Sequence, residues 1–301
     1  MKQQVFEGTG VALVTPFRAG EIDRDGLTDM VEHVLDGGVS FIVALGTTGE
    51  ANTLNPDERQ LVLDTIKKAA NGRVPLVAGC FGGNNTRQLC ASFEKFDLQG
   101  FSAVMSHAPS YNKPPQEGLY QHYMAVAEAS PLPIILYNVP GRTASNIEAE
   151  TIVRLAEASP KFIAVKEASG DLVQAMHIAK NKPDSLALLS GDDPLTLPML
   201  ACGAKGVISV VANAYPETFS GMVRAALQGD WHKARERHFS LLDLYPWLFV
   251  DGNPAGVKAA LETMGLCSKE VRLPLSSIQK DHFRLLKAEM RKIEQSEPVR
   301  T

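Results

Sequence analysis

Eight short apolar segments, each beginning 20 to 33 residues after the one before it, recur along this 301-residue chain. Most are continuous runs of hydrophobic residues rather than alternating ones, which is typical of parallel strands that are covered on both faces. The segments begin at Thr9, Phe41, Val74, Ser102, Pro133, Phe162, Leu186 and Gly206. This spacing leaves room for one helix between each pair of strands.

Amphipathic helical patterns fill these intervals. Residues 23–38 carry an apolar stripe and end at two glycines, and residues 55–70 begin with Asn55 as the N-cap before Pro56. The regular alternation predicts an α/β fold, a (β/α)8 TIM barrel, whose usual size of about 250 residues fits the chain. An open doubly wound sheet is the alternative, but the segment after the first strand lacks the glycine-rich phosphate-binding turn of that fold.

The strand segments cease after about residue 230. Residues 231–249, 253–265 and 276–294 predict three further helices, and no long polar linker precedes them. We therefore expect a catalytic barrel over residues 1–230 and a C-terminal helical extension, residues 231–301, packed on it.

Composition excludes several classes of protein. A formal net charge of −4 without any basic run argues against nucleic acid and anionic membranes as partners. The four cysteines form no C-x-x-C pair, which predicts reduced thiols. The chain shows neither the apolar core of a signal peptide at its start nor an apolar run long enough for a membrane helix. We expect a cytoplasmic protein.

Lys166 is the most informative residue at a strand end. It follows the apolar run 162–165 without a break, and active sites of such barrels lie at the carboxyl ends of the strands. Strand alternation predicts that Lys166 points inward with Ala164 and that Glu167 points outward. A low-dielectric interior disfavours an ammonium group, and enzymes use such positions to keep a neutral lysine amine as a nucleophile toward carbonyls. The alternative is a structural ion pair, for which Glu167 faces the wrong way.

Other strand ends offer groups that suit the same chemistry. Tyr137 ends the fifth segment, and Arg142 follows in a sharp turn with a guanidinium group that suits a carboxylate. The turn at 46–50, GTTGE, offers backbone N–H groups and the hydroxyls of Thr47 and Thr48 to an anion. We interpret His107 as a residue that either supports the site from behind or packs, and the acidic pair at 192–193 as a helix cap. No metal-binding pattern is present.

Three motifs together are specific: GTTGE at 46–50, YNVPGRT at 137–143 and KEASGD at 166–171. In this order, on the second, fifth and sixth strands, they resemble the pyruvate-dependent Schiff-base aldolases of the N-acetylneuraminate lyase superfamily. Within it the chain most resembles the dihydrodipicolinate synthase family. The similarity extends from the first strand to the C-terminal helices and includes NPAGVK at 253–258.

The resemblance implies a lyase that condenses pyruvate with L-aspartate 4-semialdehyde to 4-hydroxy-tetrahydrodipicolinate, in lysine and diaminopimelate biosynthesis. Lys166 would form the Schiff base, so no separate cofactor is expected. Tyr137 would relay protons, hydrogen-bonded to Thr47 and to Tyr111. The latter would reach from an adjacent subunit, which implies a homo-oligomer, commonly a tetramer built as a dimer of dimers.

The resemblance also implies the binding residues. Thr47 and Thr48 would hold the pyruvate carboxylate, while Gly191 and Ile208 would line the pocket. Arg142 would bind the carboxylate of the semialdehyde. This arginine favours the synthase over the alternatives, an N-acetylneuraminate lyase or a 2-keto-3-deoxy sugar acid lyase. A pyruvate-binding protein without catalysis is a further alternative, although the lysine, the tyrosine and both threonines are present.

The chain departs from the family at the residues that bind inhibitory lysine in feedback-regulated members. Pro56, Gln88 and Ser110 stand where the family has a histidine, a glutamate and a tyrosine, and Asn84 alone is retained. Loss of the acidic partner for the lysine ammonium predicts little or no feedback inhibition by L-lysine.

Overall fold

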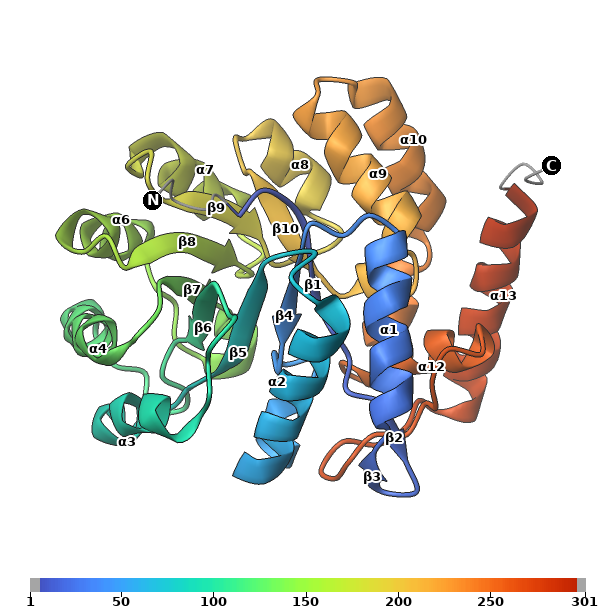
Figure 1. Cartoon of the computed structure of the whole chain (residues 1–301). Helices are drawn as coiled ribbons and strands as arrows, with labels where there is room; N and C mark the ends of the chain where they lie inside the picture. Colours follow the sequence, from blue (N-terminus) through green and yellow to red (C-terminus); the bar gives the residue numbers. More distant parts are fainter. Residues whose placement is uncertain (1–5, 297–301) are drawn as a thin grey trace.

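A computed structural model describes residues 6–296 and shows a closed barrel of eight parallel strands (Figure 1). The strands neighbour one another in the order β1, β10, β9, β8, β7, β6, β5, β4. Their bounds are Gly8–Ala12 (β1), Phe41–Ala44 (β4), Leu76–Gly82 (β5), Ala103–His107 (β6), Ile134–Asn138 (β7), Phe162–Glu167 (β8), Ala187–Ser190 (β9) and Gly206–Ser209 (β10). All eight predicted strands are confirmed. A small hairpin, β2 (Phe17–Arg18) with β3 (Glu21–Ile22), follows the first strand.

Helices surround the barrel on its outer face (Figure 1). They are α1 (Arg24–Asp36), α2 (Pro56–Ala70), α3 (Thr86–Ser92), α4 (Gln116–Ala129), α6 (Ala149–Ala158), α7 (Leu172–Asn181), α8 (Thr196–Ala201) and α9 (Pro216–Leu227). The short helix α5 (Pro140–Thr143) instead follows directly on the end of β7. The predicted start of α2 is confirmed, because Asn55 and Glu58 form a reciprocal capping box there. Three short 3-10 turns, η1 (Ala51–Thr53), η2 (Phe93–Lys95) and η3 (Val211–Asn213), complete the connections.

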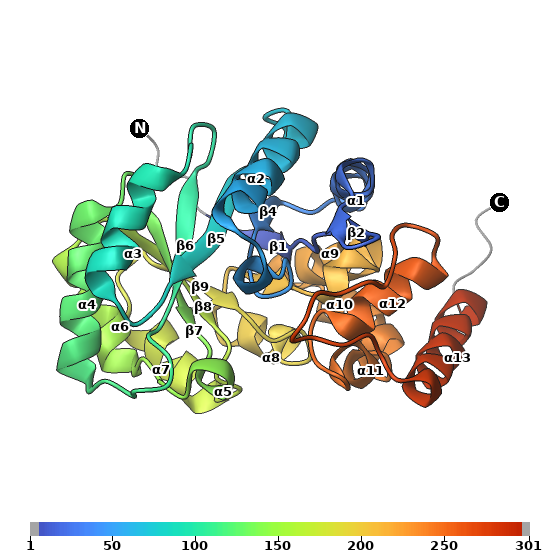
Figure 2. The same ribbon diagram turned by 90° about the horizontal axis from the view of Figure 1, so that it is seen from below.

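Four helices rather than three follow residue 230. They are α10 (Trp231–Leu242), α11 (Tyr245–Phe249), α12 (Ala255–Thr263) and α13 (Lys280–Ser296), and they lie together on one side of the barrel (Figure 2). The prediction of a single helix over 231–249 was wrong. Pro246 lies in the first turn of α11, where its missing N–H costs nothing, whereas within a continuous helix it would break the hydrogen-bond ladder.

The barrel separates two hydrophobic clusters. The inner cluster fills the space between the strands and includes Val43, Met105, Ile135, Ala164 and Ile208. The outer cluster lies between the strands and the helices and includes side chains of α10 to α13, so those helices share the core of the barrel's outer layer. The outermost ends of the two predicted units, residues 1–5 and 297–301, lie outside the described residues.

The direction of Lys166 follows from the register of β8. The pairing of β7 with β8 shifts by one residue at Ile134–Ile135, so that Ile163 and Ala164 both belong to the inner cluster. Val165 then faces the outer cluster. Alternation therefore aims Lys166 inward, as predicted. Within residues 6–296, no helix has the length and apolarity that crossing a bilayer requires.

Candidate active site

A cavity of about 510 Å³ opens where the strands end, and we call it the strand-end cavity. Its walls come from the turn after β4, the ends of β5, β6 and β7, α5, α2 and the loops before α12 and α13. The lining residues are Leu45, Gly46, Thr47, Glu50, Ala51, Asn52, Thr53, Arg59, Gly79, Cys80, Gly82, Met105, His107, Tyr137, Arg142, Asn253, Pro274 and Leu275. A larger groove of about 1050 Å³ lies on the outside, between α1 and α2, away from the strand ends.

Lys166 lies directly beside Tyr137. The two residues pair in the register of β7 and β8, and the lysine Nζ atom lies 4.4 Å from the centroid of the tyrosine ring. The two residues are only 4% and 6% exposed. Such a contact stabilises a cation above the ring face but supplies no counter-charge. Within the part of the chain that the structure describes, no carboxylate forms an ion pair with Lys166.

Glu167 faces the other side of the strand. Its carboxylate accepts hydrogen bonds from the side chains of Asn138 and Gln174, each at 2.9 Å, and from the backbone N–H of Ser169 at 2.7 Å. These bonds fasten β8 to β7 and to α7. Lys166 therefore does not form an ion pair with Glu167, which was the structural alternative.

Gly191 makes room for the lysine side chain. A Cβ atom at this position would lie 2.6 Å from the Cβ of Ala168 and 3.0 Å from the Cγ of Lys166. Its N–H donates to the carbonyl of Glu167 at 2.7 Å, which holds the two strand ends together. Ile208 lies in the inner cluster and is 1% exposed, and neither it nor Gly191 is among the residues that line the strand-end cavity.

The two threonines occupy a tight turn with different surroundings. Leu45 and Glu50, at either end of the turn, both have left-handed backbone conformations, with φ of 57° and 53°. Thr47 is exposed and lines the strand-end cavity. Thr48 is buried, and its Oγ1 accepts a hydrogen bond from Nδ2 of Asn253 at 2.9 Å. Among the described residues, no hydrogen bond joins Thr47 to Tyr137.

Three residues that hold this turn had no predicted role. Besides Asn253, they are Glu50 and Lys258, whose Oε1 and Nζ atoms lie 2.6 Å apart with both side chains fully buried. The second carboxylate oxygen of Glu50 accepts from the backbone N–H of Arg272 at 3.0 Å. Burial lowers the pKa of Lys258, and the adjacent Glu50 opposes that effect. These residues belong to the motifs GTTGE and NPAGVK, which the sequence did show. A single sequence does not reveal that two motifs about 200 residues apart are in contact.

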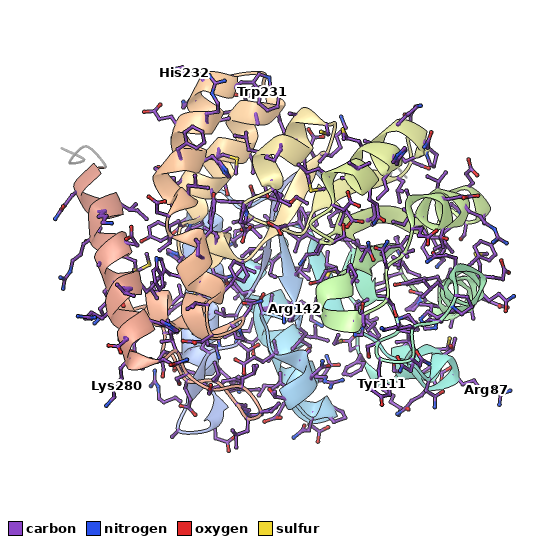
Figure 3. The ribbon with its side chains drawn as sticks, turned by 180° about the vertical axis from the view of Figure 1, so that it is seen from behind. Arg87, Tyr111, Arg142, Trp231, His232 and Lys280 are labelled. Carbon is purple, nitrogen blue, oxygen red and sulfur yellow. The ribbon has the colours of Figure 1, made fainter. Side chains whose placement is uncertain are left out.

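Arg142 and Tyr111 lie in different places. Arg142, on α5, is exposed and lines the strand-end cavity (Figure 3). Tyr111 is 91% exposed and lies toward the edge of the same view, with a left-handed φ of 72°. Its loop is held in place, since its N–H donates to the carbonyl of Thr143 and Asn84 bonds both polar atoms of the Ser110 backbone. Within one chain Tyr111 does not reach Tyr137, and the expected contact would need a second chain.

Asp192, Asp193 and His107 bond to backbone groups near the strand ends. Asp193 accepts from the N–H groups of Val210 and Val211, and Asp192 from that of Leu195, in the turn before α8. His107 lines the cavity, and its Nδ1 lies 2.8 Å from the carbonyl oxygen of Ala108. Among residues 6–296, no group of three histidine, cysteine, aspartate or glutamate side chains is arranged to hold a metal ion.

Comparison with known proteins places the chain. The model of the dihydrodipicolinate synthetase family matches residues 5–293. The chain belongs to this family. The 4-hydroxy-tetrahydrodipicolinate synthase of Flavobacterium psychrophilum is 51% identical over 279 residues, 92% of this chain and 95% of the relative. The enzyme of the same name from Phocaeicola vulgatus is 46% identical, covering 96% of this chain and 97% of its own.

Solved structures of the family share the fold. The crystal structure of dihydrodipicolinate synthase from Aquifex aeolicus superposes with a TM-score of 0.92 at 40% identity, over 96% of this chain and 98% of that one. The enzyme from Thermotoga maritima gives a TM-score of 0.93 at 36% identity, over 97% and 99% of the two chains. The barrel and its C-terminal helices are thus the architecture of the dihydrodipicolinate synthetase family.

Proposed function

We propose that this protein is a lyase that condenses pyruvate with L-aspartate 4-semialdehyde to give 4-hydroxy-tetrahydrodipicolinate. The observation that carries the proposal is the buried Lys166, which forms no ion pair with a carboxylate among the described residues. It lies beside Tyr137, and Tyr137 and Arg142 both line the strand-end cavity. A primary amine in such a place suits attack on a ketone. The names of the relatives, 4-hydroxy-tetrahydrodipicolinate synthase, support the same activity.

The first half of the reaction builds a nucleophile from pyruvate. The neutral Lys166 amine attacks the ketone carbon of pyruvate, and the resulting carbinolamine loses one water to form an imine. The protonated imine withdraws electrons from the methyl group, which loses a proton and leaves an enamine. Tyr137 is the group that we assign to move these protons, because its ring lies against the lysine amine. The imine itself is the electron sink, so this chemistry calls for no separate cofactor.

The second half forms the ring. The enamine carbon attacks the aldehyde carbon of L-aspartate 4-semialdehyde, and the aldehyde oxygen takes up a proton. The amino group of the same substrate then attacks the imine carbon and expels the Lys166 amine, which closes the ring and regenerates the enzyme. One water leaves per turnover, in the first half.

We assign the binding roles from the positions of these residues at the strand ends. Thr47, which lines the strand-end cavity, and the adjacent Thr48 would receive the pyruvate carboxylate, with Gly191 next to the lysine side chain and Ile208 in the inner cluster. Because Thr48 accepts from an amide N–H of Asn253, its own hydroxyl hydrogen is free to point to an anion. Arg142 would bind the carboxylate of the semialdehyde by a charge-assisted, bidentate contact.

We further propose a homo-oligomer, a dimer of dimers, in which Tyr111 enters the site of an adjacent subunit. The exposed tyrosine on a loop that its backbone bonds hold in place supports this role. The catalytic unit would be the barrel, residues 1–230, with residues 231–301 packed on it. Four free thiols fit the cytoplasmic location expected from the sequence.

Assays with alternative substrates test the activity. Purified protein is supplied with pyruvate and L-aspartate 4-semialdehyde in one arm, and with N-acetylneuraminate or 2-keto-3-deoxygluconate in the others. We expect condensation in the first arm and no cleavage of either sugar acid. Cleavage of a sugar acid without condensation of the semialdehyde would overturn the proposal.

A further inference from the structure

His107 belongs to a row of inward-facing side chains on three neighbouring strands. The register pairs it with Tyr137 of β7, and it pairs Tyr137 with Lys166 of β8. Alternation along β6 aims His107 inward, because Ala103 and Met105 of the same strand belong to the inner cluster. The tyrosine therefore lies between the lysine and the histidine. The proposed reaction uses the first two of these side chains, and it has given the histidine no role.

The imidazole ring of His107 packs against the backbone of the next strand. Gly82 of β5 pairs with His107, and a Cβ atom at this glycine would lie 2.1 Å from Nε2 of the histidine. Only a glycine leaves room for the ring there. Both residues line the strand-end cavity, and His107 is partly exposed. The ring is thus held from one side and stays in contact with the cavity.

One hydrogen bond determines which ring nitrogen of His107 is free. Nδ1 lies 2.8 Å from the carbonyl oxygen of Ala108, and because a carbonyl oxygen only accepts, Nδ1 carries a hydrogen. In the neutral ring Nε2 then has the lone pair that accepts a proton. Among the described residues, Nε2 has no hydrogen-bond partner. The same carbonyl stabilises the imidazolium, since a charged donor makes a stronger hydrogen bond.

Two titratable neighbours of His107 keep one charge state near neutral pH. Burial raises the pKa of the Cys80 thiol, which lines the same cavity, to about 12. On α4, burial lowers the pKa of His122 to about 4, and a positive charge on His107 lowers it as well. Both side chains are therefore neutral at pH 7. Imidazole is the side-chain type that most readily gains and loses a proton in this range, as a proton acceptor must.

The charged side chains of the cavity wall do not compete for this role. Glu50 is paired with Lys258 at 2.6 Å. Arg59 and Arg142 also line the cavity, and arginine keeps its proton at every pH at which proteins are folded. Tyr137 shares the cavity, and within residues 6–296 its hydroxyl forms no hydrogen bond that would occupy it.

We propose that His107 is the proton acceptor behind Tyr137 in the condensation, an inference that rests on the proposed function. The methyl group of the pyruvate iminium loses a proton to the Tyr137 oxygen, and the phenol passes its own proton to Nε2 of His107, directly or through one water. A neutral enamine and an imidazolium result. After the enamine carbon has attacked the aldehyde, the imidazolium returns a proton through Tyr137 to the alkoxide oxygen. The imidazole is then neutral again.

Deuterium exchange into the methyl group of pyruvate measures the first of these transfers without the second substrate. We expect the wild-type protein to catalyse this exchange in deuterium oxide. His107→Gln should slow both the exchange and the condensation by about a hundredfold, with KM for pyruvate little changed. His232→Gln is the matched control, because it removes an exposed histidine of α10 outside the cavity (Figure 3) and should leave both rates unchanged.

Two further readouts distinguish proton transfer from a structural role. His107→Ala leaves space beside Gly82, so imidazole added to the solution should raise the exchange rate of this variant severalfold. In the wild type at saturating pyruvate, the exchange rate should fall at low pH, because an imidazolium accepts no proton. His107→Gln should lack this decline. A His107→Ala variant that imidazole does not rescue, or a pH profile that His107→Gln leaves unchanged, would contradict the proposal.

An exchange rate that stays unchanged in His107→Gln would overturn the proposal. If Tyr111→Phe abolished exchange at the same time, the proton acceptor would be Tyr111 of an adjacent subunit. Borohydride trapping of the pyruvate imine is measured in parallel. Trapping that persists in His107→Gln shows that this variant is folded, whereas absence of trapping in the wild type would refute the proposed function instead.

A chemical test on the wild-type protein requires no variant. Diethyl pyrocarbonate acylates accessible neutral imidazoles, and peptide mapping reports which histidines have reacted. We expect the loss of methyl exchange to follow the modification of His107 and not that of His232. Exchange that continues after His107 is fully modified would contradict the proposal, even if neither His107 variant folded.

Discussion

Oε1 of Glu50 lies 2.6 Å from Nζ of Lys258, and neither side chain is accessible to solvent. The pair joins the turn that carries Thr47 and Thr48 to α12, about 200 residues later in the chain. Asn253 adds a second link to the same turn through Thr48. The helices after the barrel thus fix the place where the pyruvate carboxylate is proposed to bind.

We predict that Lys258→Met destabilises the protein strongly. It leaves the Glu50 carboxylate buried without its counter-charge, a change that costs about 3–5 kcal/mol. The comparison is Glu117→Gln, which breaks the exposed pair of Glu117 with Arg154 and should cost about 0–1 kcal/mol. Urea unfolding of the two variants measures the difference. Equal losses of unfolding free energy in the two variants would show that the Glu50–Lys258 pair does not hold the turn.

Asn253→Ala should weaken pyruvate binding more than it slows the chemistry. Without the amide N–H, the Thr48 hydroxyl is no longer oriented toward an anion, and the loss of one hydrogen bond costs about 1 kcal/mol. We expect KM for pyruvate to rise about fivefold, the equivalent of that free energy, with kcat changed much less. Asn181→Ala, an exposed position at the end of α7, is the control. A fall in kcat at constant KM would assign Asn253 a different role.

The buried carboxyl group of Asp193 should make the free energy of unfolding depend on pH. Burial raises its pKa from 3.8 to about 6, although hydrogen bonds from Ser209, Val211 and Val210 oppose this. The folded state favours the protonated acid. The stabilising contribution of the Asp193 carboxyl group to the free energy of unfolding is therefore complete below about pH 4, declines as the pH rises, and is lost above about pH 6.

Asp193→Asn removes this titration, since the amide oxygen can still accept from both backbone N–H groups. Between pH 4 and pH 7, the free energy of unfolding of the variant should therefore rise by about 3 kcal/mol relative to that of the wild type. This free energy corresponds to a pKa shift of about two units. Denaturant unfolding across that range measures it. Stability curves that stay parallel would show that Asp193 titrates normally.

We predict little inhibition by L-lysine. Pro56, Gln88 and Ser110 stand where feedback-regulated relatives are expected to carry groups that bind lysine. Among the described residues that line the cavity, Glu50 is the only carboxylate, and Lys258 neutralises it. The condensation rate is measured against L-lysine concentration at saturating and at subsaturating pyruvate. Half-maximal inhibition at millimolar concentration or below would contradict this prediction.

The sequence predicted the barrel well because parallel strands carry a local signal. Continuous apolar runs such as 162–165, and capped helices such as the one that begins at Pro56, can be recognised without knowing which elements pack against them. Lys166 and Tyr137 could be paired because strand ends of a barrel meet at one edge. The links of Glu50 to Lys258 and of Asn253 to Thr48 were missed, because only tertiary packing brings these residues together. The break at Pro246 was missed because apolar periodicity continues across it.

Borohydride reduction in the presence of pyruvate tests directly whether Lys166 forms the imine. We expect the wild-type protein to gain one reduced pyruvate adduct, peptide mapping to find it on Lys166, and Lys166→Ala to gain none. Lys161→Ala, a change just before the same strand at a lysine that bonds the Ser130 carbonyl, should be labelled normally. Covalent labelling that persists in Lys166→Ala, or an adduct on another lysine of the wild type, would show that Lys166 is not the residue that forms the imine.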